Sequence, residues 1–95
     1  MTMFIGVCTF EVHIPDSGSL KTKRQSIRSL KDRIRSKFNV SVAEIEDNDL
    51  WQKATLAVAA VSNDGTHLNQ TLDHVLDVVR GVPEIDLLDY HIELF

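Results

Sequence analysis

Residues 53–62 read KATLAVAAVS, and Asn63, Asp64 and Gly65 follow them directly. A ten-residue run that is rich in small and β-branched apolar side chains, with turn residues after it, predicts a strand. Asp64 and Gly65 then open a helix, because aspartate is favoured where a helix begins. The stretch therefore predicts a strand that passes directly into a helix, and its neighbours decide how this pair is completed.

The residues after Gly65 predict the rest of that helix and a last strand. Apolar side chains recur at three- and four-residue steps, which places them along one side of a helix; they are Leu68, Leu72, Val75, Leu76 and Val79. Gly81 and Pro83 end the helix. Residues 84–94, EIDLLDYHIEL, predict a strand at the end of the chain.

The residues before Lys53 predict two further strands. Residues 40–47, VSVAEIED, read as a strand that a hairpin connection joins to 53–62. Residues 3–14, MFIGVCTFEVHI, predict the first strand, and the turn-forming residues 15–19 end it. A helix capped by Ser19 or Thr22 lies between these two strands. Its apolar residues form one stripe over about 25 Å; they are Ile27, Leu30, Ile34 and Phe38.

The predicted order of elements is βαββαβ. Right-handed crossovers turn this order into an α+β fold, a ferredoxin-like sandwich in which a four-stranded antiparallel sheet carries both helices on one face. The 95 residues fit one domain, so we expect a single domain over residues 1–95.

The predicted central strands carry apolar residues on both faces. In the first strand Ile5 and Val7 have the opposite parity to the core residues, and the strand at 53–62 is apolar at both parities. Two helices cover one face of the sheet, so the other face should be polar in a monomer. We therefore expect a second copy or another partner to cover the open face or extend an edge strand, and we favour a homodimer.

Positive charge is concentrated in the first helix. Residues 20–38, LKTKRQSIRSLKDRIRSKF, hold eight of the ten basic residues and one acid, whereas the rest of the chain holds two bases and thirteen acids. The net charge of −4 hides this separation between +7 and −11. Such a local field favours association of one basic helix with an anionic partner.

Most of these bases share one side of the helix or its first turn. At 100° per residue, Arg24, Arg28, Lys31 and Arg35 fall within a sector about 60° wide. Lys21 and Lys23 join Arg24 in the first turn, where the helix dipole disfavours cations but free N–H groups favour phosphate. Two interpretations stay open: an anion or nucleic-acid site, or a solvated surface balanced by acids nearby in the chain, namely Glu44, Glu46 and Asp47.

If the ligand is RNA, the sequence favours contact with its backbone. The strand at 53–62 has no aromatic residue on which bases could stack. Structured RNA approached through its phosphates is therefore expected, and no DNA partner is expected.

Candidate catalytic and metal-ligating residues do not assemble into a site in the sequence. His67 and His74 stand seven residues apart, about 10.5 Å along a helix and too far to share one ion. Cys8 lies within a predicted strand and not at a helix N-terminus that would activate a thiol. Trp51, in the hairpin connection, either closes the end of the core or is an exposed anchor at a partner interface. We expect no catalytic residues, no metal and no cofactor.

The sequence also indicates a cellular compartment. Residues 1–10 lack the basic and long apolar regions of a signal peptide, and no stretch of about 18–20 apolar residues could span a bilayer. The single cysteine, which permits no internal disulfide, fits a reducing compartment. We expect a cytoplasmic protein with no membrane partner.

Four short motifs resemble the YlxP-like family, a bacterial family of unknown function. They are SLKTKR at 19–24, FNVSVAE at 38–44, LWQ at 50–52 and SN at 62–63, and the similarity covers essentially the whole chain. The resemblance implies a ferredoxin-like fold and a gene often found beside those for translation initiation factor two and ribosome-binding factor A. The family's basic motif falls on Leu20, Lys21, Lys23 and Arg24, with Thr22 where an acid is common, and it brings no agreed active site.

The leading prediction is a non-enzymatic protein that binds ribosomal RNA or a ribosomal particle through the first helix. Its site residues are Lys21, Lys23, Arg24, Arg28, Lys31 and Arg35. The alternative is a protein–protein adaptor or small-ligand regulatory module that uses the open sheet face or an edge strand, with Trp51, Ile5 and Val7 at the interface. An acylphosphatase, which has this fold, ranks last because residues 15–20 supply no arginine for a phosphate loop.

Overall fold

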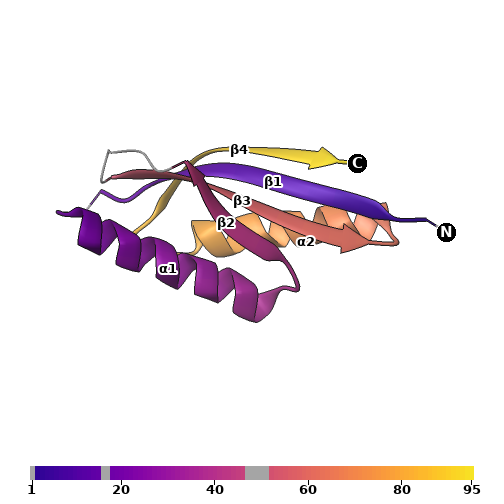
Figure 1. The fold of residues 1–95 in the computed structure, drawn as a ribbon, viewed down its shortest axis with the longest axis horizontal. Helices are drawn as coiled ribbons and strands as arrows, with labels where there is room; N and C mark the ends of the chain where they lie inside the picture. Colours follow the sequence, from indigo (N-terminus) through magenta and orange to yellow (C-terminus); the bar gives the residue numbers. More distant parts are fainter. Residues whose placement is uncertain (1, 16–17, 47–51) are drawn as a thin grey trace.

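The structure, a computed structural model, describes residues 2–15, 18–46 and 52–95. The elements follow the predicted order βαββαβ (Figure 1). They are β1 (Phe4–His13), α1 (Leu20–Lys37), β2 (Ser41–Glu46), β3 (Lys53–Ser62), α2 (Gly65–Arg80) and β4 (Asp86–Leu94). The predicted connection at 48–52, including Trp51, lies largely outside the described residues, and nothing is assigned to Trp51.

The four strands form one antiparallel sheet in the order β2-β3-β1-β4. Both helices lie on the same side of this sheet, as Figure 1 shows. The predicted ferredoxin-like sandwich is therefore confirmed. The molecule is elongated, 49 × 21 × 18 Å, because β1 and β3 pair over ten residues, about 33 Å of extended chain.

The helix ends explain where each helix starts and stops. Ser19, not Thr22, caps α1, since its hydroxyl accepts the backbone N–H of Thr22 at 3.2 Å. Asp64 caps α2 in the same way, and its carboxylate accepts the N–H of His67 at 3.1 Å. After α2 the chain makes a turn in which Ile85 donates to the Val82 carbonyl. This turn delays the last strand, predicted from residue 84, until Asp86.

The core fills the space between the sheet and the helices. Alternate residues of β1 and β3 are buried beneath the helices, including Phe10 and Leu56, and the predicted stripe of α2 is buried throughout. At Gly6 a Cβ atom would lie 2.9 Å from Leu72 Cδ1 and 3.0 Å from Leu68 Cγ. This glycine therefore lets α2 pack closely on β1.

Two irregularities interrupt the sheet. The register of β1 against β4 shifts between Glu11 and Val12, and that of β2 against β3 shifts between Glu44 and Glu46. Both bulges lie in pairs that include an edge strand, where such features are common. Among the described residues, neither helix is both long enough and apolar enough to cross a bilayer.

Candidate nucleic-acid interface

The buried stripe of α1 contains one basic residue. Lys23 is 2% exposed and lies in line with Ile27, Leu30 and Ile34, at steps of four, three and four residues. The prediction that Lys23 belongs to an exposed basic surface is therefore wrong in its placement. Its side chain lines a hollow with Leu20, Arg24 and Glu44 and is not available to a macromolecular ligand.

The other predicted bases stay at the surface. Lys21, Arg24, Arg28 and Arg35 are exposed, and Lys31 is half-buried. Together these five residues make up what we call the basic surface. It flanks the buried stripe on the side of α1 that faces β2, since Arg24 shares a hollow with Glu44 and Arg35 contacts Val42.

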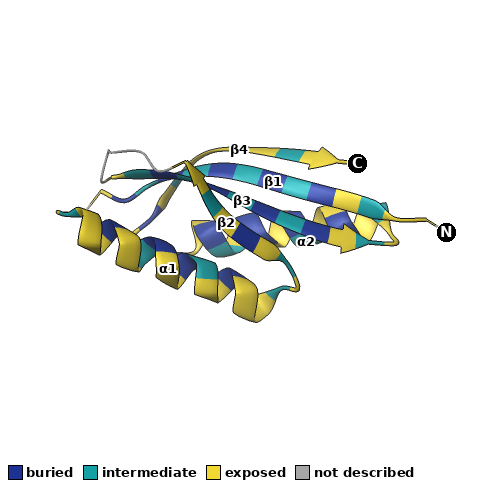
Figure 2. Cartoon of the chain, in the orientation of Figure 1, coloured by how far each residue is buried: buried dark blue, intermediate teal, exposed yellow. Residues whose placement is uncertain are grey.

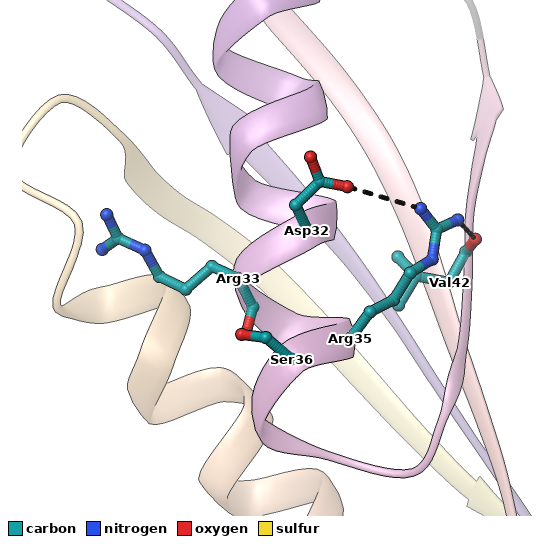
Figure 3. A network of polar contacts seen from close by, with 5 residues as sticks. All are labelled: Asp32, Arg33, Arg35, Ser36 and Val42. Carbon is teal, nitrogen blue, oxygen red and sulfur yellow. Dashed lines mark hydrogen bonds and ion pairs between the residues drawn. The ribbon is translucent and has the colours of Figure 1, made fainter.

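Arg35 differs from the other members of the basic surface because it has protein partners. Its Nη2 donates to the Val42 carbonyl at 2.9 Å, and its Nη1 lies 3.8 Å from Asp32 Oδ1 (Figure 3). Lys21, Arg24, Arg28 and Lys31 form no ion pair with the described part of the chain. Their charge is therefore left to solvent or to a ligand.

Sequence reasoning passed over the opposite flank of α1. Arg33 extends to the other side of the helix from Arg35 (Figure 3) and lines a hollow with Glu84 and Ile85. Lys37 is exposed near the start of β2 and lines a different hollow. At 100° per residue, Arg33 and Lys37 lie more than 100° around the helix from the basic surface. This calculation from the sequence predicts a second positive flank on α1.

The acids expected to balance the basic surface do so only in part. Glu44 is half-buried and lines the hollow that contains Lys23 and Arg24, about 310 Å³ in volume. Glu46 accepts a hydrogen bond from Thr55 on β3 at 3.4 Å and so is turned to the open face of the sheet. Asp47 lies outside the described residues. Of the acids expected to balance the basic surface, Glu44 is thus the one that the described residues bring to it, where Asp32 also lies 3.8 Å from Arg35.

The first turn of α1 contains no acidic residue. Acids there would satisfy the helix dipole, and their absence leaves the positive end of the dipole beside Lys21 and Arg24. A helix end with this charge favours an anionic group such as a phosphate. The arrangement costs stability in the free protein, about 0.3–1 kcal/mol for each cation.

The open face of the sheet carries an apolar row at one end. Ile5 pairs with Val61 on β3 and exchanges two backbone hydrogen bonds with Phe95 at 3.1 and 2.7 Å. These three side chains are 39%, 66% and 66% exposed, and Figure 2 shows the exposed ends of β1, β3 and β4 side by side near the chain termini. Val7 lies in the next row and is half-buried. The predicted interface residues Ile5 and Val7 therefore do share the open face.

The remaining candidates for chemistry stay apart. Burial, helped by Asp73 and opposed by Arg80, raises the pKa of the Cys8 thiol to about 11, which keeps it protonated and unreactive. His13 lies 3.7 Å from Asp86, and His91 lies 3.0 Å from Glu93. Among the described residues, no group of three potential ligands could hold a metal ion.

Comparison with known proteins places the chain in a family. Over 82 residues it is 39% identical to the uncharacterized protein YlxP of Bacillus subtilis (strain 168), covering 86% of this chain and 89% of that protein.

Solved structures share the fold at low identity. The de novo designed protein Foldit4 is similar with a TM-score of 0.60 and 10% identity, over 98% of this chain and 96% of that chain. A dimeric ferredoxin-like protein of unknown function from Thermobifida fusca is similar with a TM-score of 0.51 and 12% identity, over 100% of this chain and 92% of that chain.

The family resemblance seen in the sequence motifs is confirmed by a family model. The model for a protein of unknown function, DUF503, matches residues 5–92. The YlxP protein of Bacillus subtilis is thus a relative of this chain, and this chain belongs to the DUF503 family.

Proposed function

We propose that this chain is a cytoplasmic, non-enzymatic protein that binds the phosphate backbone of structured RNA, within ribosomal RNA or a ribosomal particle. The contact is made by the basic surface of α1. Lys21, Arg24, Arg28 and Lys31 bind phosphates, and Arg35 contributes through the part of its guanidinium that Val42 and Asp32 leave free.

One observation carries this proposal. Four bases on one side of a helix, three of them exposed, form no ion pair with any described residue, although the chain holds more acids than bases. A surface kept charged for solubility alone would gain from mixing both signs along the helix. A ligand that brings its own negative charge accounts for the separation.

The geometry favours structured RNA over a stacked single strand. The middle of the open sheet face presents Val7, Thr9, Ala57 and Ala59 on β1 and β3, with no aromatic ring among them. Base stacking needs such rings, whereas contact with a helical backbone needs only spaced cations. Sequence-independent contact with double-stranded segments is therefore the expected mode.

Co-sedimentation with purified small ribosomal subunits tests the proposal. The variant Arg24→Gln/Arg28→Gln/Lys31→Gln lowers the net charge by three and spares Lys23 and Arg35, which have structural contacts. A matched control, Asn63→Glu/Thr66→Glu/Gln70→Glu, lowers the charge equally at exposed positions in and before α2. Wild type and control should sediment with subunits at low salt, and the α1 variant should stay in the supernatant. If wild type, the α1 variant and the control all sediment equally with the subunits, or if none of them does, the proposal is rejected.

A second candidate function rests on the apolar row of Ile5, Val61 and Phe95. The four strands of the open face are 6 to 10 residues long and about 4.8 Å apart, which gives roughly 550 Å² per copy, so two copies would bury about 1,100 Å², just above the roughly 1,000 Å² expected of a specific interface. Pairing of two copies through this face would give a homodimer that presents two basic surfaces. Sedimentation velocity of Ile5→Lys/Val61→Lys against wild type tests it, and a monomeric wild type at micromolar concentration rejects it.

A further inference from the structure

A surface hollow of about 410 Å³ lies where the end of α1, the end of β3 and the first half of α2 meet. We call it the α1–α2 hollow. Lys37, His67 and His74 supply its charged or chargeable side chains, and Phe38, Val61 and Leu68 supply its apolar surface. Its volume falls within the usual range for sites that bind small molecules.

We propose that the α1–α2 hollow binds a small phosphorylated ligand of nucleotide size. Lys37 and one of the two histidines bind the phosphate, and the rest of the ligand lies along the other histidine and on Phe38, Val61 and Leu68. This site does not rest on the proposed RNA binding, because it lies on the flank of α1 opposite to the basic surface.

The charge of the lining is the first argument. None of the described residues that line the hollow is acidic, although acids outnumber bases in the chain. At 100° per residue, Asp73 and Asp77 point about 60–120° away from His67 and His74 around α2. Each has a partner elsewhere: Asp73 accepts from Asn69 at 3.5 Å, and Asp77 pairs with Arg80 at 3.2 Å.

The spacing of the two histidines is the second argument. His67 and His74 are two helical turns apart, about 10.5 Å, which is too long for a shared metal ion. Both nevertheless line the same hollow. A molecule that is several ångströms long, with a charged group and a flat apolar group, can lie along both turns where an ion cannot.

Hydrogen-bond donors complete the site. Ser62 Oγ accepts the backbone N–H of Asp64 at 3.1 Å, so its own hydroxyl hydrogen can be donated to a ligand. Thr71 has its hydroxyl hydrogen engaged by the His67 carbonyl at 3.0 Å. Ser62 and the amide of Asn39 are therefore the neutral donors that the lining offers to phosphate oxygens.

The groups that face the site are Lys37 from α1 and His67 and His74 from α2, while β3 contributes only the neutral Val61 and Ser62. Asp64, which caps α2 through the His67 N–H, is the acid that the structure ties to this end of α2.

The test is a titration of the ¹⁵N-labelled protein, followed by amide shifts, with adenosine monophosphate, inorganic phosphate and adenosine as probes. Adenosine monophosphate should shift signals of residues 37–39, 61–62 and 67–74. Inorganic phosphate should bind more weakly because it lacks the apolar part, and adenosine should bind more weakly still. Absence of shifts at about 10 mM adenosine monophosphate, or equal affinity for adenosine, overturns the proposal.

Two variants locate the site. His67→Gln/His74→Gln should lose at least about tenfold in affinity for adenosine monophosphate, whereas the control His13→Gln/His91→Gln, which removes two imidazoles from the open sheet face, should bind as wild type does. Equal affinity of both variants contradicts the assignment. Arg24→Gln/Arg28→Gln/Lys31→Gln should keep its affinity for adenosine monophosphate, so failure of the RNA proposal and failure of this site can be told apart.

Discussion

Arg35 Nη2 donates a hydrogen bond to the backbone carbonyl of Val42 at 2.9 Å, which ties the last turn of α1 to the edge strand β2. The same guanidinium lies 3.8 Å from Asp32. Arg35 is thus a structural member of a surface whose other exposed bases make no such contact; they are Lys21, Arg24 and Arg28. The positive side of α1 combines one residue that holds the fold with others that are free to bind.

This difference predicts that two arginine substitutions lower stability to different extents. Arg35→Ala should lower the free energy of unfolding by about 1–2 kcal/mol, because it removes a charged hydrogen bond to a partly buried carbonyl. Arg28→Ala should change it by less than about 0.5 kcal/mol. Urea denaturation of both variants measures the contrast, and equal stability of the two contradicts the structural role of Arg35.

The burial of Lys23 predicts that its positive charge contributes little to RNA binding. Lys23→Met removes one positive charge from α1 but should leave RNA affinity within about twofold of wild type, because the side chain is 2% exposed. Arg28→Met removes the same charge from the exposed surface and should weaken binding several-fold. A filter-binding assay at one fixed salt concentration compares them. Equal losses for both variants would show that net charge alone governs binding.

The close packing of α2 on Gly6 of β1 predicts that no larger side chain fits at this position without loss of stability. Gly6→Ala should destabilise the protein by about 1–3 kcal/mol, since the new methyl group meets Leu72 Cδ1 at 2.9 Å in a filled core. Gly18→Ala is the matched control, because nothing lies within 4 Å of a Cβ placed there. Thermal unfolding followed by circular dichroism reports both. Combining Gly6→Ala with Leu72→Ala should cost less than the sum of the two, and strict additivity would argue against the contact.

Cys8 predicts a loss of stability at alkaline pH. Burial raises the pKa of the thiol from 9.0 to about 11 in the folded protein. Its contribution is complete below pH 9, and the free energy of unfolding then falls as the pH rises toward 11, because the unfolded chain loses the proton first. The loss from this one group should be about 2 kcal/mol.

Comparison with Cys8→Ala isolates the effect from other groups that titrate in this range. The variant should be less stable at neutral pH, through the cavity it leaves, and should show a shallower decline from pH 9 to pH 11. Parallel declines for the two proteins would contradict the raised pKa. A thiol reagent should modify wild type only as fast as the protein unfolds.

The periodicity of apolar residues predicts most of the fold, but it does not predict which side chains contact each other between elements. The parity of Phe10 and Leu56 and the steps of the α2 stripe are local properties, so the sequence predicts the layers and the element order. The spacing of residues 23, 27, 30 and 34 also places Lys23 in the buried stripe. A lysine is expected at the surface, so the residue type pointed to the wrong position. The hydrogen bond from Arg35 to Val42 depends on the packing angle of α1, which no local pattern encodes.

The candidate sites were predictable to different degrees for the same reason. Charge clustering in α1 is visible along the chain, so Arg24 and Arg28 could be named from sequence. The row of Ile5, Val61 and Phe95 depends on the register of three strands. The presence of Lys37 and His74 in one hollow depends on how the end of α1 packs beside the end of β3 and the first half of α2. Both relations join residues that are distant in sequence, and neither follows from spacing.

The salt dependence of RNA binding tests the central claim most directly. Affinity for small ribosomal subunits should be measured from low to moderate salt for wild type and for Arg24→Gln/Arg28→Gln/Lys31→Gln. If the basic surface neutralises about three or four phosphates, the logarithm of wild-type affinity should fall with the logarithm of salt at a slope near −3, and the variant should have a slope near zero. Salt-independent binding by wild type, or the same slope in both proteins, would contradict the account.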